Sequence, residues 1–285
     1  MLGLLDAGGG MRGIFAAGLY DYCIDHNIQF DYCVGVSAGA SNIIQFLSGG
    51  KKASYDFYSQ YTFRKEYLSL KNFFRTGNLV NLEYFLSLLL SSGEIPLDFS
   101  SLSANKTKFD LVATDAKTGH AVYFNLDHMK QDDYRPIQAS CSVPIISRPC
   151  FIDDVPYYDG GMSDPIPIHR LEDQGCDYFV IVLTRPKDYR RPERSFHFPA
   201  NLISLRFPQV AKAIKRRPRL YNQQLEYALS LEREGKAIII APKDIGKMQT
   251  FTRDKKMLEF LYKEGYANGK RLKQFFIDKN IPFQR

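Results

Sequence analysis

The residue whose surroundings most clearly indicate chemistry is Ser37, which stands in the pattern Gly35-Val36-Ser37-Ala38-Gly39. The apolar residues 32–36 predict a short strand before it, and a helix is expected after it. In such a turn the two glycines relieve a crowded backbone, so that the serine Oγ projects toward the first N–H groups of the helix. That geometry makes a nucleophile. The alternative is a packing turn without chemistry, so an oxyanion hole and a base must also be found.

A glycine-rich turn near the N-terminus is the candidate oxyanion hole. It follows an apolar segment, 2–7, that predicts a first strand, and it opens a helix, so its N–H groups can face an anion. The run also matches G-x-G-x-x-G, but a dinucleotide site requires an acid at the end of the second strand, where Ser37 stands instead. A nucleotide P-loop is disfavoured because no G-K-[ST] is present. The predicted oxyanion-hole residues are Gly8, Gly9, Gly10, Met11, Arg12 and Gly13.

The base is the harder part to find. An α/β-hydrolase places several strands before its serine and a histidine near its C-terminus, but only 36 residues precede Ser37. The sequence favours surface roles for His169 and His197, the two histidines that follow 159–161. Asp159 is the better candidate, because the two glycines after it allow a close backbone approach. An ordinary Asp-Gly-Gly turn is the alternative. The five histidines are His26, His120, His128, His169 and His197.

Three of these segments together resemble the signatures of one family. DAGGGMRG at 6–13, GVSAG at 35–39 and DGG at 159–161 are similar to the three motifs of patatin-like phospholipases. ASCSVP at 139–144 resembles a further segment of that family, and residues 216–222 with 238–242 resemble its bacterial branch. The resemblance implies a three-layer α/β/α fold with a mixed, mostly parallel central sheet. It also implies an acyl hydrolase that uses a Ser-Asp dyad without a histidine.

Under this resemblance Ser37 is the nucleophile and Asp159 the general base. The N–H groups of Gly9, Gly10 and Met11, with the helix that starts at Ala38, would hold the oxyanion. Arg12 is expected to order the glycine loop, with a contact to a lipid phosphate as the alternative. No cofactor and no metal enter this scheme, since the acid pairs at 132–133 and 153–154 are predicted to be solvated turns rather than calcium ligands.

The elements that would position these residues follow a βαβα pattern over the first 48 residues, which predicts a parallel sheet with helices on its faces. Strands at 109–114 and 121–124 predict an antiparallel hairpin, so the sheet is expected to be mixed. Residues 51–92 are predicted to be helical, and the apolar part at 79–92 is either core or the wall or lid of an acyl groove. Further helices are predicted at 220–233 and, in two pieces that break near 264–265, at the C-terminus.

The composition of the chain indicates its number of domains and its compartment. The 285 residues, 45% hydrophobic and 24% charged, suit one domain over 1–285, with 186–285 as a basic, mainly helical C-terminal portion. The apolar runs are too short for a membrane span, and the N-terminus is unlike a secretory signal. The odd number of scattered cysteines fits a reducing compartment, so a cytoplasmic protein is predicted. They are Cys23, Cys33, Cys141, Cys150 and Cys176.

The net charge of +7 is concentrated in one stretch. Residues 185–219 hold eleven Lys or Arg against two acids. Such a stretch suits an anionic membrane surface or nucleic acid, and a solvated helix face is the alternative. We expect a serine esterase of phospholipase A or lysophospholipase type, with peripheral membrane contact and no nucleic acid. The alternatives are a thioesterase or acyltransferase with the same dyad, or a non-catalytic module that binds phosphate or nucleic acid.

Overall fold

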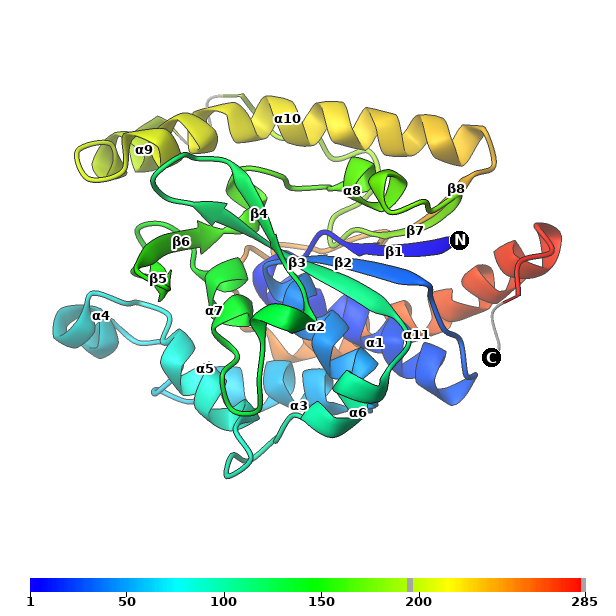
Figure 1. Cartoon of the computed structure of the whole chain (residues 1–285), viewed down its shortest axis with the longest axis horizontal. Helices are drawn as coiled ribbons and strands as arrows, with labels where there is room; N and C mark the ends of the chain where they lie inside the picture. The colour runs from blue at the N-terminus through cyan, green and yellow to red at the C-terminus, as the bar shows by residue number, and fades with distance from the viewer. Residues whose placement is uncertain (194–196, 283–285) are drawn as a thin grey trace.

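The computed structural model describes residues 1–193 and 197–282, and its centre is one eight-stranded sheet (Figure 1). The strand order is β5-β6-β3-β2-β1-β7-β8, and β4 pairs with β3. The strands are β1 Leu2–Asp6, β2 Tyr32–Val36, β3 Lys108–Asp115, β4 Ala121–Phe124, β5 Cys150–Ile152, β6 Val155–Asp159, β7 Tyr178–Val182 and β8 Ala237–Ile240.

The five strands β3, β2, β1, β7 and β8 are parallel, whereas β4 and β6 run antiparallel to β3, and β5 to β6. The predicted mixed, mostly parallel sheet and the hairpin at 109–124 are therefore confirmed. Because β1 and β2 are parallel neighbours, with Asp6 opposite Gly35, the turns that follow them open at the same edge. The glycine loop and Ser37 consequently lie side by side.

Helices cover both faces of this sheet and make the three layers. In Figure 1, α8, α9 and α10 lie above the sheet, and α1, α2 and α11 lie below it. Two separate apolar clusters fill the spaces between the layers. The helices are α1 Ile14–Asp25, α2 Ala38–Leu47, α3 Ala53–Ser59, α4 Leu70–Thr76, α5 Leu82–Leu89, α6 Phe99–Ala104, α7 Arg135–Cys141, α8 Ile168–Asp173, α9 His197–Ile203, α10 Pro208–Arg233 and α11 Lys255–Asp278.

The C-terminal helix is continuous, so the predicted break near 264–265 is wrong. Gly265 lies inside α11 and packs against α1: a Cβ there would stand 1.9 Å from the carbonyl oxygen of Phe15. Gly18 of α1 makes the reciprocal approach, since its Cβ would stand 2.0 Å from the carbonyl oxygen of Tyr262. These glycines allow two helices to pack closely rather than ending one of them.

Two further helix predictions need correction. Residues 51–92 form three short helices, α3, α4 and α5, because Leu68 pairs with Val80 and Gly77 ends α4 in the left-handed conformation. The helix predicted from residue 220 begins at Pro208 and carries Pro218 in its interior. The rule that a proline ends a helix fails there. None of the described helices is long and apolar enough to cross a membrane.

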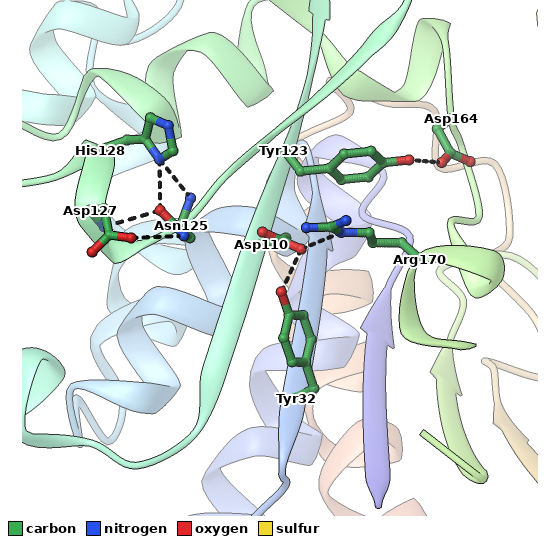
Figure 2. A network of polar contacts seen from close by, with 8 residues as sticks. All are labelled: Tyr32, Asp110, Tyr123, Asn125, Asp127, His128, Asp164 and Arg170. Carbon is green, nitrogen blue, oxygen red and sulfur yellow. Dashed lines mark hydrogen bonds and ion pairs between the residues drawn. The ribbon is translucent and has the colours of Figure 1, made fainter. Parts of the chain in front are cut away.

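A buried polar network supports the sheet on the α10 side (Figure 2). The carboxylate of Asp110 on β3 accepts hydrogen bonds from the Tyr32 hydroxyl at 2.7 Å and from Arg170 Nε at 2.6 Å. Tyr123 of β4 donates to Asp164 at 2.6 Å, and the Arg170 guanidinium lies over its ring. These contacts fix the segment that follows β6 against the sheet.

Candidate active site

Ser37 is held in a backbone conformation that serine rarely adopts, with φ 57° and ψ −126°. Both glycines of the motif are needed for this turn. A Cβ on Gly35 would stand 2.6 Å from the Cα of Ala40, and a Cβ on Gly39 would stand 2.4 Å from the carbonyl oxygen of Asp6. A non-glycine residue at positive φ costs of order 1–3 kcal/mol, so the surrounding contacts must hold it there.

The end of α7 holds the backbone of both Ser37 and Asp159. The Ser37 N–H donates to the Oγ of Ser140 at 2.9 Å, and the Asp159 N–H donates to the carbonyl oxygen of Ser142 at 2.8 Å. The sequence indicated this segment through the family resemblance, but no role was predicted for Ser140. The signal present in the sequence was a run of small polar residues ahead of a proline.

Asp159 ends β6, is 2% exposed, and lines the same cavity as Ser37. Its carboxylate accepts the Gly161 N–H at 2.8 Å. Burial raises the pKa of this carboxyl above its usual 3.8, while Arg217, the Ser37 side chain and the Gly161 N–H oppose the rise. The structure therefore brings together two residues that stand far apart in the chain, and a carboxylate with a raised pKa is a better proton acceptor.

The glycine loop passes directly beside the Ser37 turn. Gly8, Gly9 and Gly10 all have positive φ, at 61°, 143° and 61°, and a Cβ on Gly8 would stand 2.0 Å from the carbonyl oxygen of Val36. In the described part of the chain no hydrogen bond occupies the N–H groups of Gly9 and Gly10, the N-cap and first residue of the short helix at 10–13. Both are available to a ligand.

The other predicted donors of this loop are engaged elsewhere. The N–H of Gly8 donates to the Asp6 carboxylate at 2.9 Å, and the N–H of Met11 donates to the carbonyl oxygen of Thr250 at 2.8 Å. The predicted set is therefore corrected at Met11, whose amide was expected to face the oxyanion. Gly13 contributes its carbonyl oxygen to Asn42 at 2.9 Å and is a support of the loop rather than a donor.

A buried carboxylate lies beneath the loop. Asp6 is fully buried and accepts hydrogen bonds from the Gly8 N–H and, at 3.0 Å, from the Tyr20 hydroxyl. Burial raises its pKa from 3.8 to about 6, against the effect of these hydrogen bonds. Asp6 thus links the end of β1, the glycine loop and α1.

A narrow apolar pocket of about 50 Å³ adjoins Ser37. Val80, Leu82 and Phe85 line one side of it, and Cys141 and Val143 another. Other side chains of the same apolar segment, such as Leu88 and Leu89, are buried in the core. The sequence offered core or the wall of an acyl groove as alternatives for 79–92; part of the segment is core and part lines this pocket.

A second cavity, of about 410 Å³, contains Ser37 and Asp159 and is strongly basic. Arg12, predicted to order the loop, lines it with a side chain 3% exposed. Arg185, Arg191 and Arg217 of the basic stretch line it too. The stretch is therefore not one solvated face: other members, such as Arg216, are exposed on α10, and Arg194 lies outside the described residues.

The histidines lie away from both cavities as far as the structure describes them. His169 pairs with Glu172 at 2.7 Å and stacks on Tyr227, and His128 closes the short helix at 126–128. The side chain of His197 is outside the described residues. Within the described ranges, no group of three or more His, Cys, Asp or Glu side chains is placed to hold a metal ion.

Comparison with known proteins agrees with this geometry. The family model described as patatin-like phospholipase matches residues 7–171, which include Ser140, the second and third signature segments, and all of the first except Asp6. The chain belongs to the patatin-like phospholipase family. A second model, described as a domain of unknown function (DUF6363), matches residues 207–276 of this patatin-like chain.

Two individual proteins are similar to this patatin-like chain. YjjU of Escherichia coli (strain K12) is 29% identical over 195 residues, 67% of this chain and 54% of YjjU. The crystal structure of VipD from Legionella pneumophila superposes with a TM-score of 0.56 at 14% identity, over 95% of this chain and 66% of VipD. The VipD likeness shows the fold alone. The chain spans about half to two thirds of the length of these relatives.

Proposed function

We propose that this protein is a serine acyl hydrolase of phospholipase A or lysophospholipase type, which cleaves fatty-acyl esters of lipids. The observation that carries the proposal is that Ser37 and the buried Asp159 line one cavity together with Gly9 and Gly10, whose N–H groups have no partner within the described residues. The narrow apolar pocket next to Ser37 is the proposed acyl site, since alkyl chains are stabilised by burial among apolar side chains.

In the proposed reaction, Asp159 accepts the Ser37 proton while Oγ attacks the acyl carbonyl carbon. The oxyanion that forms is stabilised by the N–H groups of Gly9 and Gly10 and by the N-terminus of α2. The leaving alcohol then takes the proton from Asp159 as the C–O bond breaks. Water, deprotonated by Asp159, cleaves the acyl-Ser37 ester and regenerates the hydroxyl. Loss of one oxyanion donor typically costs about 2.7–4 kcal/mol of barrier.

The test is turnover of a short-chain p-nitrophenyl ester by Ser37→Ala and Asp159→Asn, with fluorophosphonate labelling and peptide mapping of the wild-type protein. Both variants are expected to lose turnover while they keep the circular dichroism spectrum. Ser48→Ala, at the end of α2, and Asp153→Asn, in an exposed turn, are the matched controls. Full activity in either dyad variant would remove the proposal. Product analysis with an acyl thioester and an alcohol acceptor separates hydrolysis from thioester cleavage and transfer.

We also propose that the protein docks on an anionic membrane surface, through the end of the molecule where α4 and α9 lie (Figure 1). Phe74 is 83% exposed on α4, and Leu205, after α9, is 97% exposed. Arg75 and Arg206, next to these residues, border one hollow in the surface. Apolar side chains flanked by arginines suit insertion between anionic head groups. The test is cosedimentation of the protein with phosphatidylglycerol vesicles, which Phe74→Ser and Leu205→Ser are each expected to reduce. Unchanged cosedimentation of these variants would contradict the docking.

A further inference from the structure

The geometry points to a phosphate-binding site in the basic cavity: Arg12, Arg185, Arg191 and Arg217 hold the phosphomonoester of an acyl ester that lacks a cationic head group. The class of substrate is an acylated glycerol phosphate with one or two acyl chains. The inference rests on the proposed acyl hydrolysis for the choice of ester. The binding of the phosphate itself does not depend on it.

The cavity carries a concentrated positive charge. Four guanidinium groups line it, and Asp159 is the one acid among its described lining residues. Arg12 is almost fully buried, yet its Nε and Nη1 atoms have no hydrogen-bond partner within the described ranges. Burial and the nearby Arg185 and Arg191 lower the pKa of Arg12 to about 9. Buried cations are costly unless they are paired, so this arrangement suits an anion with more than one negative charge.

Neighbouring side chains hold the arginines of the cavity in place. The Arg185 guanidinium lies over the Tyr189 ring at 4.1 Å, and that of Arg191 lies over the Tyr221 ring at 4.5 Å. Asn222 of α10 fixes the Arg191 backbone from both sides, since it accepts its N–H at 2.8 Å and donates to its carbonyl oxygen at 3.0 Å. Side chains positioned in advance lose less conformational entropy when they bind a ligand.

Lys187 and Arg190 fasten the same loop to α10. Lys187 Nζ contacts the Glu232 carboxylate at 2.6 Å, and Arg190 pairs with Glu226. Both acids belong to α10, Arg190 also donates to backbone carbonyl oxygens of its own loop, and neither cation lines the cavity. In this loop, Lys187 and Arg190 therefore attach the chain to α10, whereas Arg185 and Arg191 line the cavity.

The arginines lie in the same cavity as the proposed catalytic residues. Ser37, Asp159 and Gly9 line the same cavity as the four arginines. In an acylated glycerol phosphate only the short glycerol backbone separates the ester from the phosphate, so one such molecule can place its carbonyl at Ser37 and its phosphate among the arginines. A choline or ethanolamine head group would bring an ammonium ion into a site with four guanidinium groups, which like-charge repulsion disfavours.

The C-terminal portion contributes to the proposed phosphate site. Arg217, Tyr221 and Asn222 belong to α10, within the segment that matches the model of unknown function. Thr250 and Phe251, from the loop before α11, line the same cavity. The serine, the carboxylate and the glycine loop come from the first part of the chain. The second part then selects the head group.

The binding test uses calorimetry to measure the affinity of the Ser37→Ala variant of the whole chain for glycerol 3-phosphate. Arg217→Gln and Arg185→Gln are each expected to weaken binding by about tenfold or more, because charged hydrogen bonds are the strong ones. Arg216→Gln removes the same charge from the exposed side of α10 and is expected to bind as the parent does. Arg185 lies in a surface loop, so Arg185→Gln still tests the site if Arg217→Gln does not fold. Binding weaker than about 10 mM, or equal losses in the 216 and 217 variants, would overturn the site.

The selectivity test uses the wild-type protein with lysophosphatidate, lysophosphatidylcholine and monoacylglycerol of one chain length. The phosphomonoester is expected to have the highest kcat/KM, and Arg185→Gln is expected to lower its advantage over monoacylglycerol. Competition by inorganic phosphate as strong as by glycerol 3-phosphate would show a site for free phosphate and contradict a head-group role. Preference for the choline ester would also contradict it. If the protein binds glycerol 3-phosphate but cleaves no ester, the site stands and the proposed hydrolysis fails.

Discussion

Replacement of Ser140 by alanine tests whether the end of α7 holds the nucleophile. The Oγ of Ser140 accepts the Ser37 N–H at 2.9 Å, and Ser140 itself is fully buried. Alanine fits the same space but leaves this N–H without its acceptor. The carbonyl oxygen of Ser142, which holds Asp159, stays in place because it belongs to the backbone. The change therefore frees the backbone of Ser37, while the backbone of Asp159 stays bound to Ser142.

The size of the effect follows from two costs. An N–H left without a partner costs about 1–3 kcal/mol, and the positive-φ conformation of Ser37 stores a similar amount. If the turn relaxes, Oγ leaves the line from Asp159 to the substrate carbonyl, and kcat is expected to fall about 10- to 100-fold. If the turn holds, the same cost appears as a loss of stability, at about 2–4 °C in Tm for each kcal/mol.

The assay combines kcat and KM for a p-nitrophenyl ester with the rate of fluorophosphonate labelling and thermal denaturation. We expect Ser140→Ala to lower kcat and the labelling rate at nearly constant KM, since neither cavity that contains Ser37 is lined by Ser140. Ser142→Ala is the matched control: its Oγ donates only to the Gln138 carbonyl oxygen one turn earlier. Wild-type kcat, labelling rate and Tm in Ser140→Ala would refute the reasoning.

Three further predictions concern the supports of the site. Burial raises the Asp6 pKa from 3.8 to about 6, so the native state loses up to about 3 kcal/mol as the pH rises through this window, and Asp6→Asn is expected to remove that slope from pH-dependent urea denaturation. Gly265→Ala would place a Cβ 1.9 Å from the Phe15 carbonyl oxygen and is expected to cost about 3 kcal/mol in the same assay; an unchanged midpoint would contradict the close approach of α1 and α11. Leu82→Trp is expected to lower kcat/KM for long-chain relative to four-carbon esters, whereas Leu86→Trp, outside the pocket, should leave this ratio unchanged.

The sequence predicted the site wherever chemistry and backbone geometry require the same residues. The glycines at 35 and 39 are needed because neighbouring atoms leave no room for a Cβ, and this need is visible in the motif itself. The parallel order of β1 and β2 followed from the βαβα pattern, so the shared edge of the two turns was predictable. Asp159 was found because two glycines follow it, although only the family resemblance assigned it a partner.

The features that were missed depend on contacts between segments far apart in the chain. No local pattern indicates that the carbonyl oxygen of Thr250 occupies the N–H of Met11. Gly265 has the same local signature whether it ends a helix or lies against another one, and the nearby backbone of α1 decides between them. Likewise, the spacing of charges in 185–219 does not distinguish Arg217, which lines the cavity, from the exposed Arg216.

The meeting of Ser37 and Asp159 is a consequence of strand register. Val36 of β2 lies opposite Val112 of β3, so position 37 is level with Ala113, and Ala113 pairs with Asp159 of β6. A slip of one residue between β3 and β6 would turn the carboxylate to the other face of the sheet. Thr114 secures this register, because its Oγ1 donates to the Asp159 carbonyl oxygen at 2.8 Å and contacts the Ser163 hydroxyl at the same distance. The proposed dyad therefore depends on β3, which contributes no catalytic group but sets the level at which the two side chains meet.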